Sequence, residues 1–331
     1  GADALERHAF DIAFDADLRR FDPYFSASYT YGGLFPDLSL SLATWEGQDA
    51  AIVDDRVRWI DNRHWLLNGA ATLAIPGRVV SFDVSLGYAV RWKVAGDAPT
   101  GHEPASTAPL RPRDRRLAGV TAGASFRWLR AYARSIGVER GVAGGLSLGT
   151  RQPWLGGDGR SWTIAGHLYG YVPMPWRHGH VLAILGSGAA SRGDVGTADT
   201  FGLGGFPPQD LVLALVNREP LGGRYLRGFS SGAFRGDTYG LVNVEYRFPI
   251  IPVFRGLGTL PLAARHLWGT VFVDAGGAWN GDLRPQDDLR WDAGAELALS
   301  VNLFLGMDAT IRLGYARGFG TGGGNVVYFL L

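Results

Sequence analysis

Residues 224–236, RYLRGFSSGAFRG, hold three arginines and three aromatic residues among glycines and serines. That composition is typical of a loop. Within it Leu226, Arg227, Gly228 and Phe229 form a compact block, and the arginine is the member able to do chemistry. Its guanidinium presents a planar fork of donors that suits a carboxylate. The block is therefore either an ordinary basic turn or a segment that reaches a partner elsewhere in the molecule.

Two carboxylates stand on later segments in which apolar and polar side chains alternate. In residues 241–249 the valines and aromatic residues share one face, so Glu245 lies on the opposite one. In residues 270–276 Asp274 lies opposite the valines in the same way. A partly dehydrated interior would strengthen a pairing of Arg227 with either carboxylate. The alternative is a solvated arginine, with both carboxylates merely coating a water-filled pore.

Other kinds of chemistry find little support in the sequence. The chain has no cysteine, which excludes disulfides and thiolate metal sites. Its seven histidines are scattered, with no HExxH pattern, and no G-x-S-x-G segment occurs. A net charge of +1 gives no basic balance for nucleic acid. We therefore expect no metal, no cofactor, no nucleic-acid partner and no enzymatic activity.

The alternation that places these residues has a period of two and recurs along most of the chain. Residues 81–94, SFDVSLGYAVRWKV, put aromatic and aliphatic side chains on one face and serines, an aspartate, an arginine and a lysine on the other. Such a strand forms a wall between an apolar medium and a polar one. No apolar run approaches the ~18 residues that a membrane-spanning helix needs. The pattern predicts an all-β, transmembrane antiparallel β-barrel; the alternative is a large soluble propeller or sandwich.

About fourteen strands can be read from this alternation. They are expected at residues 7–15, 22–31, 36–46, 63–75, 78–94, 115–129, 137–150, 160–173, 180–191, 237–249, 268–279, 289–304, 307–317 and 325–331. Short and long connections alternate between them, as tight periplasmic turns and longer external loops do in outer-membrane barrels. The long connections include residues 49–61 and 192–236, whereas residues 250–267 form a long connection on the short-turn side.

The order of motifs in the C-terminal half resembles that of a known family. FGLGG (201–205), RYLRGF (224–229), YGLVNVEYRFPI (239–250), GTVFVDAGGAW (269–279) and IRLGYARG (311–318) follow one another as in the bacterial surface antigen superfamily. These are outer-membrane assembly and translocation barrels of the BamA, TamA and FhaC type. The resemblance implies a sixteen-stranded barrel whose sixth external loop folds back into the lumen. It also implies that Arg227 of the LRGF motif sits against Asp274, with Glu245 as a second candidate.

The terminal segment NVVYFLL sets Val327, Phe329 and Leu331 on one face. It resembles the last strand of the family's barrels, which lies at the seam between the first and last strands. Two departures from the family pattern stand out. Fourteen strands are read rather than sixteen, so two family strands would precede Gly1. Residues 1–331 also read as one barrel domain, without the periplasmic polypeptide-binding repeats of the family.

The resemblance implies a protein of the bacterial outer membrane that contacts lipid and inserts or translocates polypeptide. Its partners would be unfolded polypeptide clients or an accessory subunit. The alternative function is a passive pore, or a membrane anchor or export barrel for an N-terminal domain of peptidase or propeller type that this chain does not contain.

Overall fold

A computed structural model describes nine stretches of the chain. They are residues 7–17, 22–53, 56–95, 115–132, 135–194, 196–206, 225–256, 262–303 and 307–330. Nearly all of this is strand, and the helical elements are the single turns η1 (Pro153–Leu155) and α2 (Pro285–Asp288). Among these residues no helix is long and apolar enough to cross a membrane.

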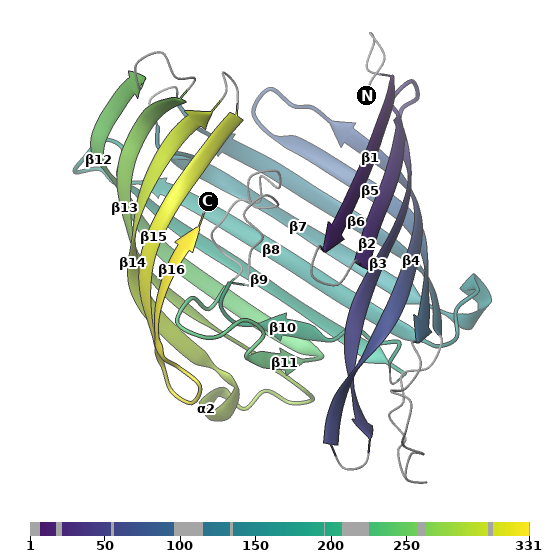
Figure 1. The fold of residues 1–331 in the computed structure, drawn as a ribbon. Coiled ribbons are helices and arrows are strands. Elements are labelled where there is room, and N and C mark those ends of the chain that lie inside the picture. Colours follow the sequence, from purple (N-terminus) through teal and green to yellow (C-terminus); the bar gives the residue numbers. More distant parts are fainter. Residues whose placement is uncertain are drawn as a thin grey trace.

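Fourteen antiparallel strands form one sheet in which chain neighbours pair throughout, β9 with β12 across the longest connection. The strands are β1 (His8–Asp17), β2 (Asp22–Tyr31), β3 (Asp37–Val53), β4 (Arg56–Ile75), β5 (Ser81–Ala95), β6 (Arg115–Arg130), β7 (Arg140–Arg151), β8 (Ser161–Pro173), β9 (Val181–Gly193), β12 (Thr238–Gly256), β13 (Leu262–Trp279), β14 (Arg290–Leu303), β15 (Met307–Phe319) and β16 (Asn325–Leu330). The sheet curls around a hollow (Figure 1). This confirms the predicted all-β barrel class and the strand number read from the sequence.

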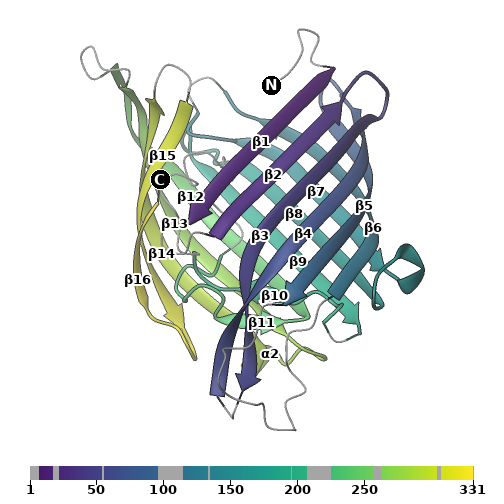
Figure 2. The same cartoon turned by 45° about the vertical axis from the view of Figure 1, so that its right-hand side comes forward.

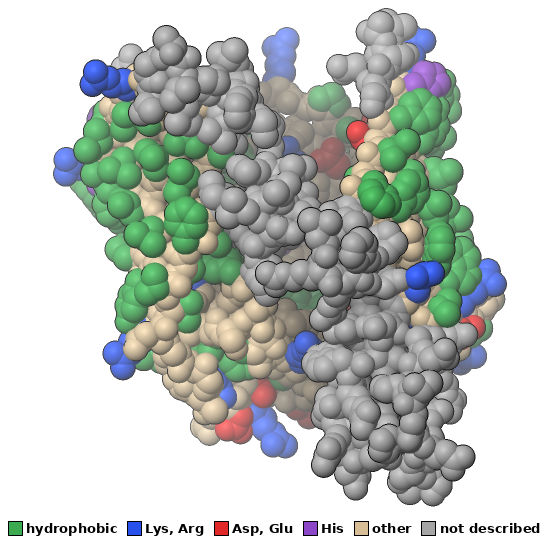
Figure 3. Space-filling view, in the orientation of Figure 1, with side chains coloured by type: hydrophobic (Ala, Val, Ile, Leu, Met, Phe, Trp, Pro, Cys, Tyr) green, Lys and Arg blue, Asp and Glu red, His purple; other side chains and the backbone are tan. Residues whose placement is uncertain are grey.

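The two faces of the sheet differ as the alternation predicts. The outer positions of β12 and β13 carry exposed valines such as Val242, Val244 and Val273. The inner positions of the same strands carry buried polar residues, Asn243 and Asp274 among them. Apolar side chains cover the outer surface of the strands on both sides of the molecule (Figure 3). Such a wall is stable with its outer face in lipid, because the side chains on that face are apolar and need no hydrogen bonds. The polar side chains of the inner face form their hydrogen bonds inside the barrel.

Two predicted connections are wrong in extent. Residues 49–61 belong mostly to strands, since β3 runs to Val53 and β4 begins at Arg56. Likewise β12 continues to Gly256 and β13 begins at Leu262, within the expected connection 250–267. Register shifts after Pro249 and Pro252 let β12 continue past its prolines, which explains why the proline-rich sequence looked like a loop. The paired ends of β3 and β4 extend beyond their neighbours (Figure 2).

The long connection between β9 and β12 folds into the hollow. Its described parts, residues 196–206 and 225–236, contain the short antiparallel pair β10 (Phe201–Leu203) and β11 (Phe234–Gly236). Both short strands lie within the curl of the sheet in the two ribbon views (Figures 1 and 2), and β11 contacts β13. The sequence indicated this loop but not the two strands, which are only three residues each.

The sheet ends at β1 and β16. In the strand order of the described residues these two strands are the edges, and they are not hydrogen-bonded to each other. Figure 1 shows them on opposite sides of the opening, and β16 is the shortest strand of the sheet, with six residues. The first and last strands therefore keep a row of backbone donors and acceptors without a strand partner in the described sheet.

An added charge should destabilise the protein when it lies on the outer face and have little effect on the inner face. Val273→Arg places a guanidinium on the outer face, and we expect it to lower the free energy of unfolding by about 2–4 kcal/mol in vesicles. The matched control Ser85→Arg adds the same charge to the inner face and is expected to change it by under about 1 kcal/mol. Urea unfolding in lipid vesicles measures both, and equal losses would contradict the assignment of the faces.

Candidate functional site

Four carboxylates converge on the inner face of adjacent strands because of the strand register. Glu245 lies on β12, Asp274 on β13, and Asp292 and Glu296 on β14. Asp274 is the cross-strand partner of Asp292, and Thr270 is that of Glu296. All four carboxylates are buried, so their negative charge requires cations and hydrogen-bond donors beside it.

Arg227 supplies the compensating positive charge from the loop. Its side chain is only 2% exposed and contacts three of the carboxylates. Nε lies 3.1 Å from Asp274, Nη1 donates to Glu296 at 3.0 Å, and Nη2 pairs with Glu245. Burial by itself lowers the pKa of Arg227, but the surrounding carboxylates outweigh it and raise that pKa, so the guanidinium is charged.

An aromatic floor completes the arginine site. The guanidinium carbon of Arg227 lies 3.8 Å from the ring centroid of Phe272, close enough for a cation–π contact. Phe272 faces Gly294 across the β13–β14 ladder, and a Cβ at that glycine would meet the Phe272 ring. The glycine therefore gives the ring room to lie beneath the arginine.

Gly228 holds the loop directly against β15. Its N–H donates to Asp292 at 3.0 Å, and its carbonyl accepts from the Gly324 N–H at 3.2 Å. A Cβ at Gly228 would stand 2.7 Å from the carbonyl carbon of Arg317 and would also meet the backbone of Gly318. Only glycine permits so close an approach of two backbones.

Leu226 and Phe229 fix the same segment by apolar packing. Both are fully or almost fully buried in a cluster with Leu203 of β10 and Leu241 of β12. The Leu226 N–H also donates to the carbonyl of Gly204 at 2.8 Å. Within the LRGF block, the Arg227 guanidinium and the Gly228 N–H therefore point toward the acids. The side chains of the other two residues, Leu226 and Phe229, point into the apolar cluster.

A second layer of donors surrounds the acids. Arg247 on β12 donates to Glu245 at 2.6 and 2.8 Å, and Arg312 on β15 donates to Glu296 at 3.4 Å. Tyr328 on β16 donates its hydroxyl to Glu296 at 2.8 Å. The cluster therefore reaches from β12 to the last strand, and Arg227 lies at its centre.

The structure brings Arg227 together with Asp274 and Glu245, the two partners considered from the sequence. Sequence reasoning missed Glu296, Asp292 and Tyr328 as members of the same cluster. The signal for the two acids was available, since both lie on the polar face of β14. Alternation alone does not give the register between strands. The register decides which inward polar residues of neighbouring strands lie side by side.

The predicted seam residues lie apart from this cluster. Val327 and Phe329 of β16 point outward, with 72% and 58% of their side-chain surface exposed. Leu331 lies outside the described residues. The inward positions of the strand belong to Tyr328 and Leu330, which are buried.

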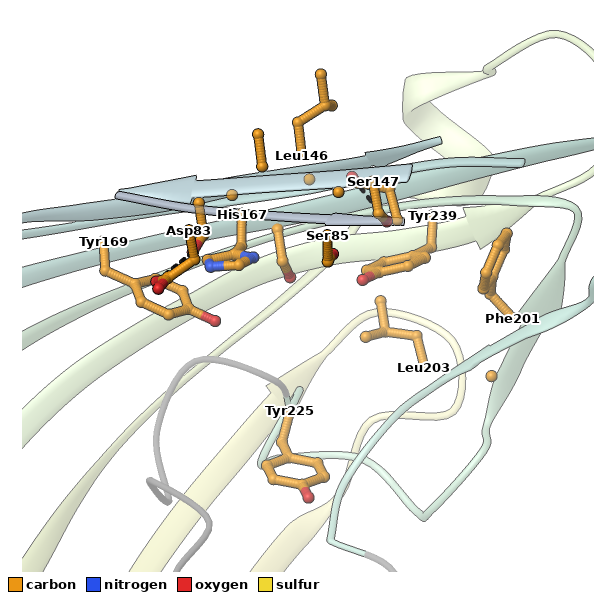
Figure 4. Close-up of a pocket in the computed structure, with 18 of the residues that line it drawn as sticks. Asp83, Ser85, Leu146, Ser147, His167, Tyr169, Phe201, Leu203, Tyr225 and Tyr239 are labelled. Carbon is orange, nitrogen blue, oxygen red and sulfur yellow. Dashed lines mark hydrogen bonds between the residues drawn. The ribbon is translucent and has the colours of Figure 1, made fainter. Parts of the chain in front are cut away.

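A cavity of about 760 Å³ separates the loop from the opposite wall. Small and hydroxyl residues of β5 to β9 line its wall, and Phe201, Leu203 and Tyr225 of the loop line the other side. In Figure 4, Ser85, His167 and Tyr169 lie on the side of the strands that faces Leu203 and Tyr225, whereas Leu146 points away. The loop thus sits against β12–β16 and leaves space beside β5–β9.

A curled transmembrane sheet with an inner loop fastened by charge defines a class of outer-membrane β-barrel proteins. The Omp85 superfamily domain matches residues 138–323, more than half of the chain. The chain belongs to the Omp85 superfamily and is a protein of the outer membrane. This confirms the family resemblance and the location predicted from the motif order. No curated protein sequence matches the chain.

Solved structures with the same fold include BamA and CdiB. BamA from Haemophilus ducreyi lacking POTRA domains 1–3 has a TM-score of 0.61 at 16% identity, over 93% of this chain and 61% of that one. CdiB from Escherichia coli has a TM-score of 0.60 at 11% identity, over 99% and 57%. CdiB from Acinetobacter baumannii has a TM-score of 0.53 at 12% identity, over 97% and 52%. The chain therefore spans less than two thirds of the chains it resembles.

The arginine site predicts a large energetic coupling. Arg227→Ala leaves three buried carboxylates short of a cation, and we expect a loss of about 3–5 kcal/mol in the free energy of unfolding. In a double-mutant cycle with Asp274→Ala, the combined loss should fall short of the sum by roughly 1–3 kcal/mol. Urea unfolding in vesicles measures the cycle. Arg235→Ala, an exposed arginine of the same loop, is the control, and full additivity of Arg227 and Asp274 would refute the coupling.

The backbone contact of Gly228 gives a separate prediction. Gly228→Ala adds a methyl group where the β15 backbone lies, so we expect the loop to move off the wall and become sensitive to protease. Gly202→Ala is the matched control, because a Cβ there meets nothing within 4 Å. Limited proteolysis of folded protein in detergent compares them, and equal cleavage of both variants would show that the close approach is not required.

Proposed function

We propose that this barrel handles polypeptide at the outer membrane, as a factor for the insertion or translocation of other chains. The superfamily and the fold support the general kind of protein. The finer role rests on features of this chain, namely an inner loop fixed by buried charge and a sheet with two edge strands. A neighbouring extended segment adds to such an edge through backbone hydrogen bonds.

The observation that carries the proposal is the continuous chain of contacts from the loop to the last strand. Arg227 donates to Glu296, and Tyr328 of β16 donates to the same Glu296 oxygen. Movement of the loop therefore changes the support of an edge strand whose one neighbour in the described sheet is β15. In this arrangement the contacts of Arg227 with the buried carboxylates would set how readily β16 pairs with a client strand.

Client polypeptides, an accessory subunit and lipid are the partners that this function requires. We also propose that the chain acts without enzymatic chemistry, because the buried charged groups around Arg227 form ion pairs and hydrogen bonds with one another. Val327, Phe329 and Leu331 are assigned to the seam in this proposal, and the outward side chains of Val327 and Phe329 would contact lipid or a client.

The second candidate is a passive pore or an anchor for another domain. The cavity beside β5–β9, lined by serines and glycines, favours it, since small polar walls suit a water-filled passage. The two candidates differ in what they do to other proteins. A pore conducts ions and leaves client folding unchanged, whereas an insertion factor accelerates folding.

Reconstituted vesicles separate the two functions. We expect the barrel to speed the folding of a urea-unfolded eight-stranded outer-membrane barrel into vesicles, measured by heat-modifiable migration on gels. Arg227→Ala and the milder Tyr328→Phe should each reduce the acceleration several-fold, with Arg235→Ala as the control. Large steady currents in planar bilayers with no acceleration would favour the pore instead.

A further inference from the structure

A second, smaller cavity lies in the wall at the end of the sheet where β5 ends and β6 begins. Its volume is about 260 Å³. Side chains of β3 to β8 line it, together with Asp199 at the start of the inner loop. It is separate from the Arg227 cluster, none of whose members contributes to its lining.

Two arginines, Arg91 and Arg151, line this cavity and bring positive charge to it. Arg151 of β7 is already engaged, with Nη2 at 2.8 Å from Asp199 and Nη1 donating to the Thr197 carbonyl at 2.7 Å. Arg91 of β5 is half-buried and has no hydrogen bond or ion pair with any described residue. It is repelled by Arg151 and attracted by Asp199, so both charges act on the same small volume.

The charge balance of the cavity leaves one positive charge unmatched. Arg91 and Arg151 together carry two positive charges, and Asp199 carries one negative charge. The Asp199 carboxylate has another donor, the Thr163 hydroxyl at 2.8 Å, and the Asp199 backbone N–H donates to the Ser191 hydroxyl. A guanidinium that is partly dehydrated and unpaired favours an anion beside it.

The remaining lining is small and polar, and it includes Thr121, Ser147, Thr150 and two glycines, Gly119 and Gly149. The Thr150 hydroxyl donates to the Ser161 carbonyl at 3.2 Å and the Ser147 hydroxyl to the Ala165 carbonyl at 3.5 Å. Thr121 adds a further hydroxyl residue to the lining. Hydroxyl groups and arginine forks are the side chains that bind tetrahedral oxyanions. Among the described residues that line the cavity, Asp199 is the only carboxylate.

Trp45 brings an aromatic ring to the same cavity and stacks on His64, with the ring centroids 5.1 Å apart. His64 itself is not a lining residue. The half-buried Arg91, which lines the cavity without a partner among the described residues, is the observation that points to a missing ligand there.

We propose that Arg91 and Arg151 form a binding site for a phosphate-class oxyanion, either free phosphate or the phosphate group of a small soluble molecule. The bound oxyanion pairs with Arg91 and competes with Asp199 for Arg151. The site does not depend on the proposed polypeptide function. Because Asp199 lies two residues before β10, occupancy of the site changes how the loop is held at that point.

Binding is measured on the folded barrel in phosphatidylcholine nanodiscs, in buffer free of phosphate and sulfate. Inorganic phosphate and glucose 1-phosphate are titrated separately, with calorimetry as the main readout and tryptophan fluorescence as the second. We expect saturable binding of at least one probe. Arg91→Gln should raise Kd about tenfold or more, since it removes a charge-assisted hydrogen bond to the oxyanion. Arg91→Lys keeps the charge but not the planar fork of donors. Its Kd should fall between that of the unsubstituted protein and that of Arg91→Gln.

Two further variants make the result specific. Arg127→Gln removes an arginine near the opposite end of the neighbouring strand β6, on a residue outside the cavity lining, and should leave Kd unchanged. Asp199→Asn removes the internal competitor and should tighten binding several-fold, an effect that a poorly folded protein would not give. Heat-modifiable migration confirms folding of each variant.

The outcomes divide clearly. Binding of inorganic phosphate alone identifies free phosphate as the ligand, and tighter binding of glucose 1-phosphate identifies a phosphorylated small molecule. Absence of saturable binding of both probes overturns the site. Equal effects of Arg91→Gln and Arg127→Gln, or weaker binding by Asp199→Asn, overturn it as well.

Discussion

The buried charge of Arg227 is the interaction on which the inner architecture depends. Transfer of a guanidinium out of water costs several kcal/mol unless carboxylates and hydrogen bonds replace the lost solvation. The same holds for Glu245, Asp274 and Glu296, which are buried on the wall. Neither the loop nor the wall is satisfied alone, so each is stable in its place only when the other is present. This mutual dependence fixes the loop more specifically than apolar packing would.

Backbone contacts at glycines make that electrostatic fit possible. Gly228 brings the loop onto β15, Gly294 makes room for the ring under Arg227, and a Cβ at Gly314 would meet the ring of Tyr328. At Gly228 the missing side chain admits a second backbone, and at Gly294 and Gly314 it admits an aromatic ring. Part of the high glycine content, 49 of 331 residues, therefore serves close contacts inside the barrel rather than turns.

The strands and their faces were predictable from sequence because lipid and lumen impose opposite requirements on alternate residues. That requirement acts locally, so Val244 and Glu245 reveal their faces without knowledge of any neighbour. The extent of β3 and β12 was not predictable, since pairing with the adjacent strand carried them past polar and proline-rich stretches. The partners of Arg227 were predictable only in part. Asp274 and Glu245 followed the family motif, whereas Glu296 required the strand register.

The distribution of charge explains why the C-terminal half carries the family signal. The Arg227 cluster lies within the matched residues 138–323 except for Tyr328. There a set of buried charges must meet at defined positions on four strands, and that constraint ties particular residues to particular places. The wall of β1–β6 lies before the matched residues and needs only alternation to separate lipid from lumen. Many sequences satisfy that weaker rule. The cavity at Arg91 lies across the boundary, since Arg91 precedes the matched residues whereas Arg151 and Asp199 fall within them.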